Sequence, residues 1–226
     1  MTRTYNQACM LAYALDRLGE RWTLLIVRDL ILGPRGFVDL QTSLGGIGGS
    51  ILSKRLKELE ETRLITAENI DGKRIQYRLT PLGESLRPTI RAMMLWSLRF
   101  MNETADPDTR QQVYETTVYK PDSLALALEI YAENNRAPAL SYVAHLIVDN
   151  QSYTVYYMAG EMTVRRGADS PAMAKIETDV ETLLRGLRRD ITPAEVRKLS
   201  HVEGDPAVLA HLLDCICSKR TEEKAA

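Results

Sequence analysis

Hydroxyl and cationic side chains repeat along one side of a segment near residue 50. Four of them follow the helical spacing i, i+3, i+4 and i+7: Ser50, Ser53, Lys54 and Lys57. Residues at this spacing share one face of a helix. Short hydroxyls and long cations on such a face can donate hydrogen bonds to phosphate oxygens and to the edges of bases. The chemistry that this face favours is recognition of a nucleic acid.

The elements that must position this face are two short helices joined by a glycine-rich turn. Residues 33–59 have this pattern, which is the outline of a helix-turn-helix. In the second helix the apolar residues are expected to form the buried face: Ile51, Leu52, Leu56 and Leu59. Residues 50–61 taken alone also fit an ordinary solvated helix. The next segment therefore decides between the two interpretations.

A β-hairpin is predicted directly after these helices. Residues 64–66 and 75–79 are strand-like runs on either side of Asp71 and Gly72. Asp-Gly favours a type I′ turn, whose two central residues both need positive φ. A helix-turn-helix followed by a hairpin predicts a winged helix. Lys73 and Arg74 near the tip could reach phosphate, although an exposed hairpin also favours lysine on its own account.

The distribution of charge predicts two modules. The 226-residue chain has a net charge of −1 and 45% hydrophobic residues, enough for packed cores. Residues 1–100 carry 15 Lys or Arg against 10 Asp or Glu, whereas the remainder carries 14 against 20. A basic first half suits a polyphosphate partner, and an acidic second half would be repelled by one. We expect domains at 1–101 and 111–226, separated by the polar stretch 102–110.

Short motifs occur in order between Cys9 and Trp96. They are ALD at 14–16, GERWTLLI at 19–26, GPRGF at 33–37 with Leu40, ILSKRLKELE at 51–60 and YRLTPLG at 77–83. In this region the chain resembles the HxlR-type winged-helix transcriptional regulators of bacteria and archaea. It departs from their pattern at Gly36, at Gly48 and Gly49, and at Arg63. The predicted DNA contacts are Arg35, Ser50, Ser53, Lys54, Arg55, Lys57, Lys73 and Arg74.

A further helix is predicted from about Leu82 to Met101, begun by Thr80 and Pro81. Its apolar residues cover more than one face, so that one stripe is left over for a partner. The resemblance implies a homodimer with this helix at the interface, and a two-fold protein suits a two-fold operator. The expected interface residues are Met94, Leu98 and Met101. The alternative is that this stripe packs on the C-terminal module.

The C-terminal half is expected to hold a small antiparallel sheet with helices. The predicted elements are a helix at 122–134, strands at 141–148, 153–158 and 162–164, and helices near 178–188, 193–199 and 206–217. With Thr178-Asp179, the run 183–186 and the run 202–206, this order is similar to the sterol-carrier-protein fold. That resemblance implies a chamber for an apolar small-molecule effector. A filled structural or dimerising module is the equal alternative. The overall fold class expected is α+β.

Enzymatic and metal chemistry find no support in the sequence. The run 45–49 lacks the Gly-Lys-Ser/Thr of a phosphate-binding loop, and no nucleophile elbow is present. Cys215 and Cys217 lie two residues apart in a predicted helix and face different directions. The three histidines are scattered, without a metal-site spacing: His145, His201 and His211. We expect no enzyme, no cofactor and no metal.

Cys9 is the thiol with a case for a functional role. It stands where some HxlR-type regulators carry a redox-sensing cysteine, although cysteine is also a common core residue. With few cysteines, no signal peptide and no long apolar run, a cytoplasmic protein without membrane contact is expected. The predicted function is DNA-binding transcriptional regulation with an apolar effector. The alternatives are redox sensing through Cys9, or a scaffold that binds lipid or another apolar ligand.

Overall fold

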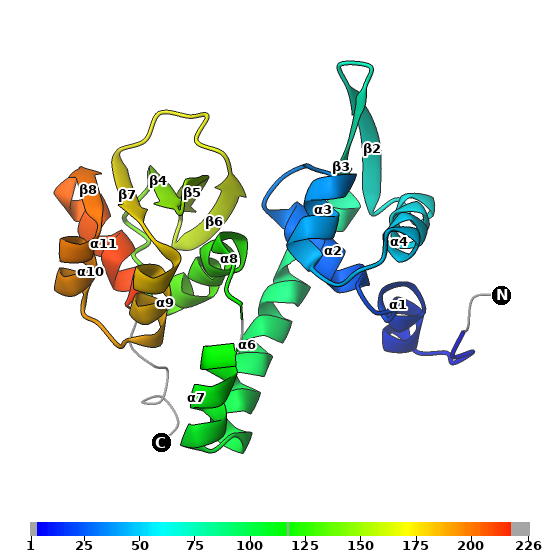
Figure 1. The fold of residues 1–226 in the computed structure, drawn as a ribbon, viewed down its shortest axis with the longest axis horizontal. Coiled ribbons are helices and arrows are strands. Elements are labelled where there is room, and N and C mark those ends of the chain that lie inside the picture. Colours follow the sequence, from blue (N-terminus) through cyan, green and yellow to red (C-terminus); the bar gives the residue numbers. More distant parts are fainter. Residues whose placement is uncertain (1–3, 117, 218–226) are drawn as a thin grey trace. The chain divides into compact units, whose positions relative to one another are not determined.

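The computed structural model describes residues 4–116 and 118–217 of the chain (Figure 1). Contacts between residues divide it into two compact units, the first ending at Met93 and the second beginning at Met94. This division lies within helix α6 (Arg87–Thr104). The sequence-based limits of 1–101 and 111–226 put the change of domain later, at residues 102–110, which begin within the last turn of α6.

The first unit combines helices with a small sheet. Its elements are α1 (Met10–Leu18), α2 (Thr23–Ile31), β1 (Arg35–Gly36), α3 (Phe37–Leu44), α4 (Gly49–Glu61), β2 (Ile65–Ile70), β3 (Arg74–Leu79), α5 (Pro81–Glu84) and the start of α6. The strand order is β1-β3-β2, and both pairings are antiparallel. Helices α3 and α4 followed by the β2–β3 hairpin form the winged helix-turn-helix that the sequence predicted (Figure 1). The two-residue strand β1 was not anticipated.

The hairpin turn has the backbone conformation expected of Asp-Gly. Asp71 and Gly72 have φ of 62° and 71°, so both central residues are left-handed. The Lys73 amide donates to the Ile70 carbonyl oxygen at 3.4 Å, and Ile70 pairs with Arg74 across the hairpin. The turn therefore places Lys73 and Arg74 at the end of the wing, as predicted.

The first unit is held together by leucine and isoleucine side chains. The buried residues come from three helices: Ile26 and Leu30 of α2, Leu40 of α3, and Leu52, Leu56 and Leu59 of α4. Each such side chain contributes about 1.5–3 kcal/mol when it leaves water. Gly83 permits a close approach of the chain beyond the wing, because a Cβ there would lie 2.1 Å from the Leu64 carbonyl oxygen. Packing of these helices fixes the orientation of α4.

The helix expected at 82–101 is broken near its start. The short helix α5 ends at Glu84, and α6 begins at Arg87 with Pro88 as its second residue. Proline has no amide hydrogen to donate to the carbonyl four residues earlier, and its ring clashes there. The same residue is well suited to the first turn of a new helix. Continuous apolar periodicity concealed this break.

The polar stretch expected to separate the domains is largely helical. Helix α6 continues to Thr104, and α7 (Pro107–Thr116) starts soon afterwards. Asp106 supports the start of α7, since its carboxylate accepts hydrogen bonds from the amide and the hydroxyl of Thr109 at 2.9 and 2.6 Å. A polar sequence with a proline here marks the beginning of a helix rather than a linker.

The second unit is a five-stranded sheet with helices. Its later elements are α8 (Pro121–Tyr131), η1 (Ala132–Asn135), β4 (Tyr142–Val148), β5 (Gln151–Met158), β6 (Glu161–Arg166), β7 (Ala174–Thr178), α9 (Val180–Arg188), α10 (Pro193–Leu199), β8 (His201–Gly204) and α11 (Pro206–Ile216). Strands β4, β5 and β6 form the antiparallel meander that was predicted. Positive φ at 149–150 and at 159–160 makes its two tight turns.

The sheet contains two strands that the sequence did not reveal. Its order is β6-β5-β4-β7-β8, with β7 parallel to β4 and β8 antiparallel to β7. Both strands are short, and β8 is mostly exposed, so neither gives the long alternation that identifies a strand. The chain contains both helices and sheets, as expected. Its second sheet has parallel and antiparallel pairings, whereas we expected a purely antiparallel sheet.

Alternation along β4 separates the two faces of this sheet. The face carrying Tyr142, Ala144 and Leu146 is buried, whereas the intervening side chains are half-buried. Tyr142 is hydrogen-bonded to His211 of α11, so the buried face is the one that the helices cover. Helices α8, α9 and α11 supply the apolar partners, among them Leu128, Leu183 and Leu212.

Candidate nucleic-acid interface

Helix α4 presents two opposite faces, one buried and one exposed. Leu52, Leu56 and Leu59 are at most 2% exposed, and they fasten the helix to the core. The polar candidates all lie on the exposed surface: Ser50, Ser53, Lys54 and Lys57. Ile51 was expected in the core, but it is 45% exposed. Adjacent residues are about 100° apart on a helix, so that Ile51 and Leu52 cannot both face inward.

The turn before α4 consists of glycines and one buried apolar residue. Gly45 and Gly46 have positive φ of 54° and 80°, and Ile47 is 4% exposed. The Gln41 side-chain amide donates to the Ile47 carbonyl oxygen at 3.4 Å. Gly48 is the N-cap and offers no side-chain oxygen. The first-turn amides of α4 therefore have no capping side chain from that residue, which leaves them accessible to an acceptor such as phosphate.

The two exposed lysines of α4 make only loose ion pairs. Lys54 Nζ lies 3.9 Å from Glu58 Oε1, and Lys57 Nζ lies 3.9 Å from Glu61 Oε1. The lysine side chains are 66% and 79% exposed. Exposed pairs one helical turn apart are worth about 0.3–0.5 kcal/mol and are weakened by salt. Phosphate can therefore compete for both ammonium groups at little cost.

Arg55 is placed differently from its lysine neighbours. Its side chain is 13% exposed, and its guanidinium is paired with Glu58 and, at 3.0 Å, with Glu20 Oε2. Glu20 precedes α2, so this pair joins two elements that are distant in sequence. We predicted Arg55 as a DNA contact, but it is half-buried and already has two carboxylate partners. In this position it holds α4 near the start of α2, and a contact with DNA stays a prediction.

The wing carries two cations at its tip. Lys73 and Arg74 are both exposed, and the Arg74 guanidinium donates to Asp71 Oδ2 at 2.8 Å. The Arg74 and Asp71 side chains are 75% and 65% exposed, so water screens this pair strongly. Further down the wing, Arg78 is paired with Glu68 at 3.1 Å. Asp71 thus sets the turn and at the same time offsets part of the positive charge at the tip.

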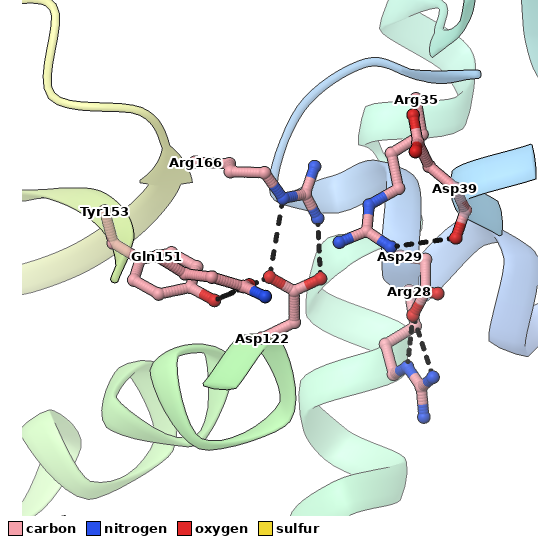
Figure 2. Close-up of polar contacts among 8 residues, drawn as sticks. All are labelled: Arg28, Asp29, Arg35, Asp39, Asp122, Gln151, Tyr153 and Arg166. Atoms are coloured by element: carbon pink, nitrogen blue, oxygen red, sulfur yellow. Dashed lines mark hydrogen bonds and ion pairs between the residues drawn. The ribbon is translucent and has the colours of Figure 1, made fainter. Parts of the chain in front are cut away.

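Arg35 lies at the base of the wing. Strand β1 pairs it with Tyr77 of β3, and its Nη1 donates to the Asp39 carbonyl oxygen at 3.3 Å (Figure 2). Nearby in the sequence, the Arg28 guanidinium donates twice to Asp29 Oδ1, at 3.0 and 2.8 Å. Asp29 is 2% exposed, and sequence reasoning missed this buried carboxylate. A charged residue within an apolar run of α2 was the available signal.

The predicted dimer residues are only half-covered. Met94, Leu98 and Met101 of α6 are intermediate in exposure. More strongly exposed on the same helix are Trp96 at 63% and Phe100 at 51%, whose rings stack with centroids 5.1 Å apart. Sequence reasoning counted both aromatic residues among the surplus apolar side chains. Helix α6 therefore exposes large apolar side chains to solvent.

The three cysteines differ in access to solvent. Cys9 is exposed just before α1, whereas Cys215 is buried and Cys217 is intermediate. Burial, followed by the nearby Asp214 charge, raises the pKa of Cys215 to about 12. Its Sγ lies 3.8 Å from His211 Nε2, but a thiol with so high a pKa is not a nucleophile at neutral pH. This Cys–His contact is part of the core.

A polar cluster closes one end of the second unit's core. Asp122, in the first turn of α8, accepts a hydrogen bond from the Tyr153 hydroxyl at 2.7 Å and pairs with Arg166 Nη2 at 2.9 Å (Figure 2). The Tyr153 hydroxyl also lies 3.0 Å from Gln151 Oε1. Asp122 is 6% exposed, so these partners balance the cost of burying its charge. The cluster fixes α8 against β5 and β6.

No group of three or more His, Cys, Asp or Glu residues within 4–116 and 118–217 is arranged to hold a metal ion. Across the same residues, no helix has the length and apolar character required to cross a membrane.

Comparison with known proteins gives similarities over less than half of the chain. A family profile described as HxlR-like helix-turn-helix matches residues 17–105. YvaP of Bacillus subtilis, an uncharacterised HTH-type transcriptional regulator, is 34% identical over 91 residues, which are 39% of this chain and 84% of YvaP. Rv3095 of Mycobacterium tuberculosis, described in the same words, is 38% identical over 96 residues, 42% of this chain and 60% of Rv3095. These relatives are regulators and not enzymes.

Among solved structures, quinone-bound YodB of Bacillus subtilis is similar to part of the chain. It is 29% identical in sequence and covers 40% of this chain and 97% of YodB, with a TM-score of 0.36.

Proposed function

The chain belongs to the HxlR-like helix-turn-helix family of transcriptional regulators, and on this premise we propose that α4 reads its operator while the wing contacts the DNA backbone. The observation that carries the proposal is the exposed polar face of α4 opposite three buried leucines. A helix fastened in this way can enter a major groove without exposing its apolar side. Ser50, Ser53, Lys54 and Lys57 are the proposed contacts on α4.

The distribution of charge supports the proposal that only the first half of the sequence contacts DNA. The first 100 residues carry a net positive charge and the remaining 126 a net negative one. Each phosphate that a cation neutralises contributes about −0.9 to the slope of log affinity against log salt. We therefore propose that Lys73 and Arg74, with the lysines of α4, supply affinity for any DNA sequence. Ser50 and Ser53 contribute to the choice of sequence.

We further propose that the protein acts as a homodimer. Met94, Leu98 and Met101 share one side of α6 and are half-covered, and we propose that a second copy covers this side. The exposed Trp96 and Phe100 lie on the opposite side of the helix. Two copies related by a two-fold axis would present two α4 helices to an operator with two half-sites. The alternative, in which this surface packs on the C-terminal half of the same chain, remains the competing prediction.

The second unit is proposed to regulate DNA binding as a sterol-carrier-like effector domain. Support comes from its sheet, which is covered on one face by α8 and α11, and from its acidic composition. The apolar effector inferred from the sequence would have to enter between that sheet and the helices. Many side chains there are fully buried against one another, including Tyr153, Tyr157 and Leu146. An apolar ligand therefore requires these side chains to move.

Redox sensing through Cys9 is a second proposal. The observation in its favour is that Cys9 is exposed, since an oxidant reaches exposed thiols most readily. Replacement by serine should abolish any change in DNA affinity caused by peroxide. If the Cys9→Ser protein responds to peroxide as the wild type does, the thiol is not the sensor.

The decisive experiment for DNA recognition begins with the protein's own genome. DNA retained by the purified full-length chain is sequenced, and the enriched fragment is used in equilibrium titrations. Ser53→Ala and Lys54→Ala should each weaken binding to that fragment by about 1–3 kcal/mol, the value of one base contact. Melting temperatures should stay unchanged, because both side chains are exposed.

The matched control is Lys198→Ala. This lysine is exposed near the end of α10, in the second unit. Its removal should leave DNA affinity unchanged, which separates a local effect of α4 from a general effect of net charge. Unaltered affinity of the Ser53→Ala/Lys54→Ala double variant for the enriched fragment would contradict the assignment of α4.

A further inference from the structure

A row of polar side chains crosses the face of the second sheet that lies opposite Tyr142 and the helices. His145 of β4 lies opposite the face that contains Tyr142, which the helices cover. The register pairs His145 with Lys175 of β7, and Lys175 with Glu203 of β8. Residues paired across neighbouring strands point to the same side of a sheet. An imidazole, an ammonium and a carboxylate therefore stand side by side there.

These three side chains line a hollow of about 350 Å³. Its remaining walls are residues 172–174 and Gly204. Gly204 has φ of 110°, and a Cβ there would lie 2.3 Å from the Met173 carbonyl oxygen. A larger residue would therefore push β8 away from β7. The volume is at the lower end of the range for small-molecule sites, about 300–1,000 Å³.

One ammonium and one carboxylate line the hollow, those of Lys175 and Glu203, and Glu177 adds a second carboxylate beside Lys175. Lys175 Nζ lies 3.2 Å from Glu177 Oε2 and 3.6 Å from Glu203 Oε1. The hydrogen bond that the Lys175 ammonium donates to Glu177, together with the charges of Glu177 and Glu203, raises the pKa of Lys175, so the ammonium keeps its proton. His201 Nε2 is 3.9 Å from the other oxygen of Glu203. A ligand that carries both signs offers an opposite charge to each of the two lining groups, whereas a ligand of one sign meets a like charge at one of them.

The Nε2 atom of His145 is a second observation that points to a bound ligand. Its Nε2 is shielded from solvent, and no hydrogen-bond partner for it is found among the residues that the structure describes. A shielded polar nitrogen left without a partner costs free energy, about 1–3 kcal/mol. Because Nε2 has almost no accessible surface, a polar group bound in the hollow satisfies it only when the imidazole turns toward that space.

We infer that the hollow binds a free amino acid. Its carboxylate would accept a hydrogen bond from the Lys175 ammonium, and its ammonium would donate to Glu203. His145 Nε2 would meet a polar atom of the same ligand once the imidazole turns toward the hollow. The site lies on the face of the sheet opposite the expected apolar chamber, and it calls for a polar, zwitterionic effector. The inference rests on the proposed regulatory role of the second unit only for its effect on DNA.

The test is isothermal titration of the DNA-free full chain with the twenty protein amino acids, one at a time. At least one should bind saturably, and Lys175→Met should weaken its binding about tenfold or more, as expected for the loss of one charged hydrogen bond. Glu203→Gln, which preserves shape, should weaken it similarly. The control Lys198→Met should bind as the wild type does. The deaminated analogue of the ligand, which lacks the ammonium, should bind less tightly than the amino acid.

Two results would overturn the inference. The first is that no amino acid binds with a Kd below about 10 mM. The second is that binding is unchanged in both Lys175→Met and Glu203→Gln. A separate titration of operator DNA with and without the ligand measures coupling. If the ligand binds without altering DNA affinity, the site stands and the regulatory role of the second unit fails.

Discussion

Arg55 of α4 and Glu20, which lies 35 residues earlier and just before α2, are joined by an ion pair of 3.0 Å. The Arg55 side chain is 13% exposed and that of Glu20 is 53% exposed. A cation held in this way cannot contact phosphate without breaking its internal pairs. It does fix the position of the proposed reading helix relative to the element before it.

We therefore expect Arg55→Met to act on stability and not on the number of phosphate contacts. Loss of the pairs with Glu20 and Glu58 should lower the free energy of unfolding by about 1–2 kcal/mol. The salt dependence of DNA binding should keep its slope. In contrast, Lys57→Ala should leave stability unchanged and flatten that slope by about one unit. Urea unfolding and titrations at several salt concentrations measure both quantities; a flatter slope for Arg55→Met would return this residue to the interface.

The comparison of Arg55 with Lys54 and Lys57 shows where prediction from sequence stops. The pattern of leucines correctly placed α4, its buried face and its exposed lysines. It could not show that Arg55 meets Glu20, because that contact depends on how α4 packs against the start of α2. The same limit applies to Ile51, whose exposure depends on the rotation of the helix by a fraction of a turn.

Pairing between strands that are distant in the sequence was the second limit on prediction from the sequence. The Asp-Gly turn and the β4–β6 meander follow from local chemistry, and both were predicted. Strands β7 and β8 join the sheet through a parallel pairing with β4, which no local signal announces. The row of His145, Lys175 and Glu203 exists only because of that pairing. In the sequence, His145 had been set aside as an isolated histidine.

The wing offers a test in which affinity should rise. Asp71 pairs with Arg74 at 2.8 Å and places a negative charge at the tip. In Asp71→Asn the amide removes this charge, and asparagine tolerates the positive φ of 62° found there. We expect tighter binding to every DNA sequence, by a few-fold at low salt, with unchanged preference among sequences. Titrations with operator and unrelated fragments would check this, and weaker binding would show that Asp71 supports the wing rather than opposes DNA.

Assembly can be tested on α6. Leu98→Glu places a charge within the proposed dimer surface, and burying an unpaired carboxylate costs several kcal/mol. We expect a monomer at micromolar concentration where the wild type is a dimer, as measured by light scattering. Leu199→Glu is the matched control, because Leu199 is an exposed leucine of α10, 52% accessible. A dimeric Leu98→Glu protein, or a monomeric wild type, would contradict the two-fold arrangement.

The buried thiol of Cys215 predicts how stability depends on alkaline pH. Burial, with a smaller effect of Asp214, raises its pKa from 9.0 to about 12, and burial also raises the pKa of Tyr142. Between about pH 9 and about pH 12 the Cys215 thiol is ionised in the unfolded chain but protonated in the folded protein. The unfolded state then binds fewer protons, so that stability falls as pH rises from about 9 toward 12. Below about pH 9 the protonated thiol makes its full contribution to the free energy of unfolding.

Replacing this thiol should therefore flatten the alkaline loss of stability. Urea unfolding at about pH 8 and about pH 10.5 should show a smaller decrease for Cys215→Ala than for the wild type, even though the variant starts from a lower stability because its core has lost a side-chain atom. Cys9→Ala is the control. Its thiol is exposed, and its removal should leave the wild-type decrease intact. Equal decreases in the wild type and Cys215→Ala would mean that the thiol does not drive the alkaline transition, and the buried Tyr142 hydroxyl would then be the group to replace, as Tyr142→Phe.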